Sequence, residues 1–144
     1  LSPGSFVHKK GNNQSCVLLV KSKAKSLLLM GDAEKKVERV LLQDHPELSA
    51  DMVIVPHHGS KTSSSAQFVS TIKPELAIVS AGYRNRFGHP AAVIVDRYLA
   101  LGTKVVNTAR AGMILIESDE EDLHVSQYRL DNQHFWQRDS NKVF

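Results

Sequence analysis

The sequence predicts an α/β domain in which helices cover a mixed sheet. Short apolar runs, typical of buried strands, alternate with segments whose apolar residues recur three and four positions apart, as in amphipathic helices. The 144 residues are enough for one domain with a core of its own. Apolar residues make up 42% and charged residues 23% of the chain, which is the composition of an ordinary globular protein.

The first half of the chain begins with a predicted hairpin. Residues 15–21 and 26–30 are apolar runs on either side of a short Ser-Lys-Ala-Lys segment. Residues 31–32 break the second run, and residues 33–43 show the apolar spacing of a helix. Residues 52–55 form a short apolar run, which predicts a buried strand.

The second half continues the alternation of helix and strand. A helix is expected at residues 65–72, because Lys73 and Pro74 follow it and proline disfavours helix in the residue before it. The other expected elements are a strand at 76–79, a loop at 80–89, a helix at 91–101 that starts with Pro90 and stops at Gly102, strands at 104–106, 113–117 and 123–128, and a polar tail at 133–144.

The loop of residues 56–65 has the composition of an active-site loop. His57 and His58 directly follow a predicted strand, and neutral imidazole binds transition metals and carries protons. Gly59 allows a sharp turn, and the hydroxyl residues after it can cap the next helix. The first free N–H groups of that helix could also hold a phosphate. The alternative is a pair of surface histidines on a plain connection between strand and helix.

Two more loops that follow predicted strands carry groups suited to metal binding or proton transfer. Asp32 follows the second strand and His89 ends the loop at 80–89, so both are expected near the histidine loop. Asp32 is an equally good helix N-cap, and His89 taken alone could simply precede a helix. Arg84 and Arg86 could clamp a phosphate or lie solvated on the surface.

Charge, cysteine content and hydropathy exclude several classes of protein. The net charge of +3, from 18 Lys and Arg against 15 Asp and Glu, is only a weak sign of an anionic partner. A single cysteine, Cys16, excludes an internal disulfide and a Cys-rich zinc site. No run approaches the roughly 18 apolar residues of a membrane span, and no signal peptide opens the sequence. Because the first residue is Leu, we expect an excised piece or a processed product.

Four blocks of sequence resemble the metallo-β-lactamase-type domain of the ComEC competence proteins, which are membrane proteins of the DNA-uptake machinery. The blocks are NNQSCVLL at 12–19, SLLLMGDAE at 26–34, VPHHGSKTSS at 55–64 and SAGYRNRFGHP at 80–90. The resemblance covers about residues 12 to 117. The proline–histidine–histidine–glycine–serine and glycine–histidine–proline blocks are specific in combination, although each alone is weak.

The resemblance implies an αββα metallo-hydrolase fold with two divalent ions, zinc or manganese, that hydrolyses phosphodiester bonds in the DNA strand that is not imported. Asp32 would bridge the ions and His58 would be a metal ligand. His57, His89 and Asn85 would have catalytic roles. The residues expected to contact the substrate are Ser60, Lys61, Arg84 and Arg86.

One part of the family pattern is missing from these residues. The His-x-His-x-Asp-His motif of the first metal site does not occur. We therefore expect residues 1–144 to be a single partial domain, the carboxyl-terminal half of the αββα sandwich, with a mixed sheet and helices on one side. Alone, it should hold metal poorly, lack activity and self-associate.

The expected partners are DNA, as a single strand, together with the missing amino-terminal half of the domain and the rest of the membrane protein. The full-length protein is expected in the inner membrane, with this domain soluble on the periplasmic or extracellular side. The alternatives are a phosphoesterase of the same fold with a small substrate, and a DNA-binding module without catalysis.

Overall fold

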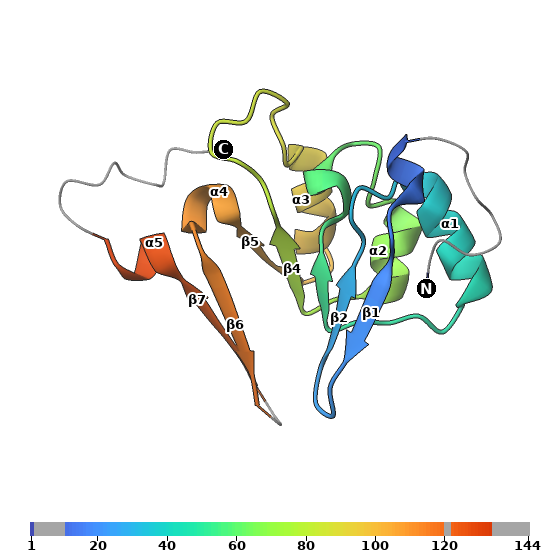
Figure 1. Cartoon of the computed structure of the whole chain (residues 1–144), viewed down its shortest axis with the longest axis horizontal. Coiled ribbons are helices and arrows are strands. Elements are labelled where there is room, and N and C mark those ends of the chain that lie inside the picture. The colour runs from blue at the N-terminus through green and yellow to red at the C-terminus, as the bar shows by residue number, and fades with distance from the viewer. Residues whose placement is uncertain (2–10, 120–121, 134–144) are drawn as a thin grey trace.

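The computed structural model describes residue 1, residues 11–119 and residues 122–133. Its centre is a five-stranded sheet in the order β1-β2-β3-β4-β5 (Figure 1). β1 is antiparallel to β2, and the other neighbours are parallel, so the predicted mixed sheet is confirmed. The strands are β1 (Leu18–Lys21), β2 (Ser26–Leu29), β3 (Met52–Ile54), β4 (Leu76–Val79) and β5 (Lys104–Asn107).

Three helices, α1 (Lys35–Asp44), α2 (Ala66–Ile72) and α3 (Ala92–Leu99), cover one face of this sheet. Side chains alternate between the two faces of a strand, and Leu28, Val53 and Ala77 lie on the helical face. The helices contribute the following buried residues to the same core: Val37, Leu41, Phe68, Val69, Ile72, Ile94 and Tyr98. The prediction of helices on one side of the sheet is confirmed.

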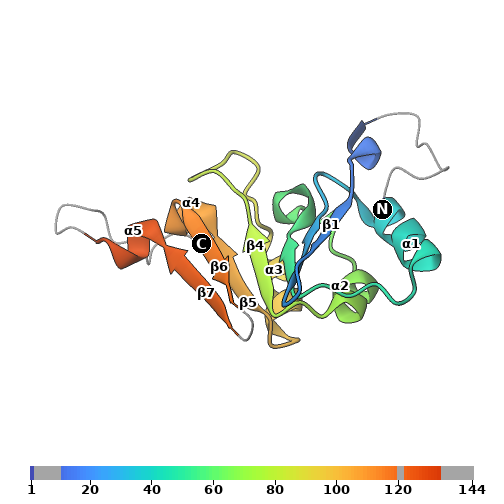
Figure 2. The ribbon, with the colours of Figure 1, turned by 60° about the horizontal axis from the view of Figure 1, so that its bottom comes forward.

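A separate hairpin covers part of the opposite face. β6 (Ile114–Ser118) pairs antiparallel with β7 (Leu123–Gln127), and the one-turn helices α4 (Thr108–Ala111) and α5 (Tyr128–Asp131) flank the pair. Apolar hairpin residues pack around a second buried cluster, which consists of Met52, Leu76, Ile78 and Val106. Figure 2 shows the hairpin beside β4 and β5, with β1 at the far end of the sheet.

The β1 end of that second face is exposed. Leu18 and Val20 of β1 pair with Leu29 and Leu27 of β2, so these four side chains share one face. Leu18 is 52% exposed and Val20 is 46% exposed. We call these four residues the β1–β2 apolar strip. No helix among the described residues is long and apolar enough to cross a membrane.

The predicted start of the first helix is wrong. α1 begins at Lys35 instead of residue 33, and Glu34 occupies the N-cap position without a side-chain capping bond. Asp32 therefore does not cap this helix. The backbone N–H of Lys35 instead donates to the Thr62 carbonyl (3.0 Å), which fixes the start of α1 to the histidine loop.

Other element boundaries also differ from those predicted. Pro90 precedes α3 and is not its first residue, because Ala91 is the N-cap and its N–H donates to the Gly59 carbonyl (2.9 Å). The first strand starts at Leu18 instead of residue 15. The expected hydroxyl cap of α2 is confirmed, since the Ser65 side chain accepts from the Phe68 N–H. The helices α4 and α5 were not predicted, and residues 134–144 of the expected tail lie outside the described residues.

Candidate functional site

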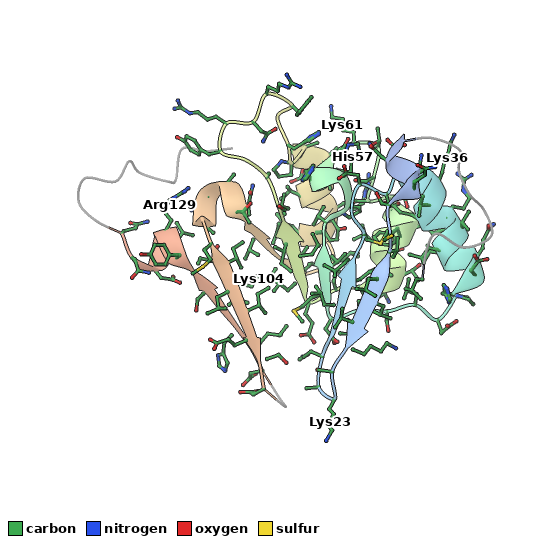
Figure 3. All side chains as sticks on the ribbon, in the orientation of Figure 1. Lys23, Lys36, His57, Lys61, Lys104 and Arg129 are labelled. Atoms are coloured by element: carbon green, nitrogen blue, oxygen red, sulfur yellow. The ribbon has the colours of Figure 1, made fainter. Side chains whose placement is uncertain are left out.

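Asp32, His58 and His89 come together at one edge of the sheet. They lie on the loops that leave the carboxyl ends of the neighbouring strands β2, β3 and β4. The His57 N–H donates to the Gly31 carbonyl (2.9 Å), which ties the first two loops to each other. Figure 3 shows His57 and Lys61 at this edge, near the loop between β4 and α3.

The histidine loop has an unusual backbone conformation. His57 (φ 50°) and His58 (φ 56°) both occupy the left-handed region, which non-glycine residues adopt only when their surroundings hold them there. Gly59 follows with φ +80°, and a Cβ built at this position would lie 2.6 Å from the Pro90 Cβ. The loop therefore requires glycine at position 59 and is packed tightly against the start of α3.

A buried carboxylate holds the far end of the same loop. Glu38 of α1 is 0% exposed, and its carboxylate accepts the backbone N–H groups of Ser64 and Ser65, the latter at 2.8 Å. From α3, Arg97 donates to the Ser64 carbonyl, and the Tyr98 hydroxyl lies 3.2 Å from Ser64 Oγ. Burial raises the pKa of Glu38. Two helices thus fix the loop that carries the histidines.

His58 and Asp32 form the centre of the site. The His58 Nδ1 lies 2.7 Å from the Ser80 carbonyl oxygen, which can only accept, so Nδ1 carries a hydrogen. Nε2 then faces Asp32 Oδ1 at 3.5 Å. Both side chains are about half exposed, and a cation bound between these two atoms would be attracted by both.

The spacing of this pair suits a shared metal ion. Zinc–nitrogen and zinc–oxygen bonds of about 2.1 Å at a tetrahedral angle separate the two ligand atoms by about 3.4 Å. A ligating histidine also commonly donates its other ring N–H to a carbonyl, as His58 does to Ser80. Among the described residues, however, no group of three or more His, Cys, Asp or Glu is arranged to hold a metal ion. The Asp32–His58 pair therefore supplies only some of the ligands that a metal centre needs.

His57 has a different environment, in which both ring nitrogens have protein partners. Nε2 lies 3.2 Å from Asn12 Nδ2, and Nδ1 lies 3.1 Å from Thr62 Oγ1 and 3.8 Å from Glu34 Oε1. Because an amide nitrogen donates, Nε2 accepts and Nδ1 carries the hydrogen in the neutral ring. His57 is less available as a ligand than His58, and it lies between the turn at residues 11–14 and the rest of the site.

His89 lies between His57 and an exposed aromatic side chain. Its ring centroid is 6.1 Å from that of His57 and 5.8 Å from that of Phe87, on which it stacks. Burial lowers the pKa of His89, and the nearby His57 and His58 lower it further. The ring is therefore neutral at pH 7 and can accept a proton.

An open pocket of about 580 Å³ adjoins these rings. The site residues predicted from sequence that line it are Ser60, Lys61 and His89, and Phe87, Gly88, Ala91, Ala92 and Val93 complete the lining. A basic side chain and a histidine thus share one concave surface, which is suited to a phosphate group.

Asn85, Arg84 and Arg86 are not among the residues lining the pocket. Asn85 uses its side chain within its own loop, since Oδ1 accepts the His89 N–H (2.9 Å) and Nδ2 donates to the His89 carbonyl (2.6 Å). This geometry favours a structural role for Asn85. Arg84 lies over the Tyr83 ring and Arg86 over the Phe87 ring.

Several residues of the site had no predicted role. Asn12, Glu34 and Thr62 surround His57, and Phe87 lines the pocket. The place of Phe87 between Arg86 and the Gly-His-Pro block was a signal in the sequence. For Asn12 the only signal was its place in a sequence block that resembles a known family, because its contact with His57 spans 45 positions.

No family model matches the chain. It is 36% identical over 129 residues to Recombination protein 2 of Haemophilus influenzae, an alignment that covers 90% of this chain and 16% of that protein. It is 35% identical to Competence protein ComA of Neisseria gonorrhoeae (79% and 17% covered) and 35% identical to ComE operon protein 3 of Bacillus subtilis (79% and 15%). The chain thus spans about one sixth of the length of the curated relatives it matches.

Proposed function

Because this chain belongs to the ComEC family of competence proteins, we propose that it carries part of a metal-dependent phosphodiesterase site in a DNA-uptake protein. The observation that supports this most is the pair formed by His58 and Asp32. Their facing atoms are 3.5 Å apart, and the Ser80 carbonyl fixes the tautomer of His58.

In this proposal the side chains at the sheet edge have separate tasks. His58 Nε2 and Asp32 Oδ1 would hold metal, and two divalent ions, zinc or manganese, would polarise the phosphoryl group and offset charge in the transition state. Lys61 and Ser60 would bind a non-bridging phosphate oxygen in the pocket that they line. His89, which is neutral at pH 7, would accept a proton from the attacking water and then pass it to the leaving oxygen, and His57 would orient the substrate beside it.

The proposed substrate is DNA as a single strand, and the proposed product is the degraded strand that is not imported. Arg84 and Arg86, on the loop above the pocket, would contact neighbouring phosphates. The other proposed partners are an amino-terminal half of the same hydrolase domain, which would cover the β1–β2 apolar strip, and the membrane-embedded part of the protein. We place this domain on the periplasmic or extracellular side of the inner membrane.

The test is a nuclease assay on the full-length protein with zinc or manganese, using single-stranded and double-stranded DNA. Asp32→Ala and His58→Ala should each abolish turnover. His124→Ala is the matched control, because His124 Nε2 also lies near a carboxylate (3.4 Å from Asp119 Oδ2) but on the hairpin. Activity that survives loss of Asp32 or His58 would contradict the assignment of these residues.

A second assay concerns the 144-residue chain alone. Catalytic zinc sites use about three protein ligands, and the Asp32–His58 pair supplies two. Calorimetric titration with zinc and manganese should show weak binding, and the chain alone should not hydrolyse single-stranded DNA. Tight stoichiometric binding together with turnover would show that the site is complete within this chain.

A DNA-binding module without catalysis is the second candidate, favoured by the absence of a three-ligand group in the described part of the chain. It predicts that the full-length protein binds DNA but that neither zinc nor manganese supports turnover.

A further inference from the structure

Phe87 is the most exposed large apolar side chain among the described residues, at 67%. It lies on the loop between β4 and α3, which extends beyond the sheet edge in Figure 1, and it lines the pocket together with Lys61 and His89. Its ring contacts are with His89, which stacks on it, and with the Arg86 guanidinium. An exposed aromatic ring beside a predicted phosphate site can bind a ligand that has an apolar face.

The surroundings of the ring are those of a stacking surface. The His89 ring lies 5.8 Å away at an interplanar angle of 19°, and the guanidinium of Arg86 lies 4.7 Å from the ring centroid. His89 in turn contacts His57 edge-on at 6.1 Å. The Phe87 ring and its aromatic neighbour His89 therefore line the same pocket, and the Arg86 guanidinium lies over the Phe87 ring.

We propose that Phe87 is a stacking platform for one nucleobase of single-stranded DNA, with the phosphate next to that base held in the pocket by Lys61. This inference rests on the proposed function and adds a residue that selects the form of the substrate. Aromatic side chains beside basic groups are the common means of binding unpaired strands, because every base presents a π face.

The platform distinguishes single strands from duplexes. In a duplex both faces of each base are already stacked, so Phe87 could not reach a base face without unstacking one. The contact between an exposed arginine and a ring is weaker than stacking of a base on that ring. A base would therefore displace the Arg86 guanidinium, which would then be free to contact a phosphate.

Tyr83 provides a matched control on the same loop. It is 48% exposed, and the Arg84 guanidinium lies 5.3 Å from its ring centroid, much like the arrangement at Phe87. Unlike Phe87, Tyr83 does not line the pocket. Removing its ring should therefore have little effect on binding.

The experiment measures binding of labelled DNA to the full-length protein by fluorescence anisotropy, without added divalent metal so that the DNA stays intact. The probes are a single-stranded oligonucleotide, the matching duplex, and a strand of equal length made of abasic sites. Phe87→Ala should weaken binding of the normal single strand by about 5- to 150-fold. Phe87→Trp should keep the wild-type affinity, and Tyr83→Ala should change it less than threefold.

Three further readouts separate stacking from charge. Phe87→Ala should bind the abasic strand and the duplex as the wild type does, because neither offers an unpaired base. It should also leave the salt dependence unchanged, since no phosphate contact is lost. Equal losses on abasic and normal strands would overturn the stacking role, and so would unchanged binding of the normal strand.

The outcome is separable from that of the nuclease test. A loss of strand binding in Phe87→Ala together with no turnover in the full-length protein would support the platform and reject the hydrolase. The opposite result would support the hydrolase and reject the platform. In that case turnover depends on Asp32 and His58, and Phe87→Ala changes neither turnover nor strand affinity. A wild-type protein that binds no single strand would overturn the inference by itself.

Discussion

Replacing Glu38 with glutamine should loosen the histidine loop without touching the site itself. The wild-type carboxylate accepts two backbone N–H groups, from Ser64 and Ser65. A glutamine of the same size offers one acceptor and one NH₂ group, so one of the two N–H groups would face another donor. An unsatisfied buried donor costs about 1–3 kcal/mol. At roughly 4 °C per kcal/mol for a domain of this size, the melting temperature should fall by about 4–12 °C.

The pH dependence gives an independent check on this prediction. Burial holds the pKa of Glu38 above its ordinary value of 4.5, so the folded protein keeps a proton that the unfolded chain has released. This carboxyl therefore contributes stability that is fully present below about pH 4.5 and is lost as the pH rises through the raised pKa. Glutamine does not titrate, so the stability advantage of the wild type over Glu38→Gln should shrink across that window.

The measurements are thermal unfolding of both proteins between pH 4 and 8, and hydrogen exchange of the Ser64 and Ser65 amides. Both amides should be protected in the wild type, and at least one should exchange faster in Glu38→Gln. Glu47→Gln is the matched control, because Glu47 is exposed and its substitution should change stability by less than about 0.5 kcal/mol. A melting temperature equal to that of the wild type, with both amides still protected, would refute the role assigned to Glu38.

Three further predictions concern binding, the loop and association. Replacing Lys61, Arg84 and Arg86 with alanine in the full-length protein should weaken its binding of single-stranded DNA. The slope of log affinity against log salt concentration should become less steep by about 2. An unchanged slope would mean that the three side chains contact no phosphate. Gly59→Ala should lower stability by at least about 1 kcal/mol in thermal unfolding, because its Cβ would meet Pro90 and its φ is positive; unchanged stability would show that the loop can shift. The chain should form dimers or larger assemblies through the exposed apolar residues of β1, and a monomer at high concentration in light scattering would contradict this.

The parts of the fold that could be predicted are those set by local pattern. Continuous apolar runs identified β3 and β4, whose residues are mostly buried, and helical spacing identified α1, α2 and α3. The start of α1 was missed because Gly31 turns the chain at φ +53° and the Asp32 N–H donates to Ser15 Oγ (3.0 Å). This contact, 17 positions away, helps to hold residue 32 outside the helix, and no local pattern reveals it.

The residue types of the site could be predicted, but their contacts could not. His57 and His58 are adjacent and chemically identical in sequence, and only the positive φ angles of both direct their rings to different partners. Glu38 has the pattern of a solvated helix charge, although it lies three positions before Leu41, on the same side of α1. Its burial depends on the amides of a loop 26 and 27 positions away, which pattern analysis does not pair with it.

The partner segment proposed above would account for two separate features at once. The Asp32–His58 pair supplies fewer ligands than a catalytic zinc site uses, and the β1–β2 apolar strip exposes about half of the Leu18 and Val20 side chains to water. Further metal ligands on a flexible tail would explain only the first feature, and self-association of the chain would explain only the second. A packed segment that lies on the strip and reaches the sheet edge would explain both. It also predicts that supplying this segment in trans would raise metal affinity and suppress self-association together, whereas either effect alone would require two separate partners.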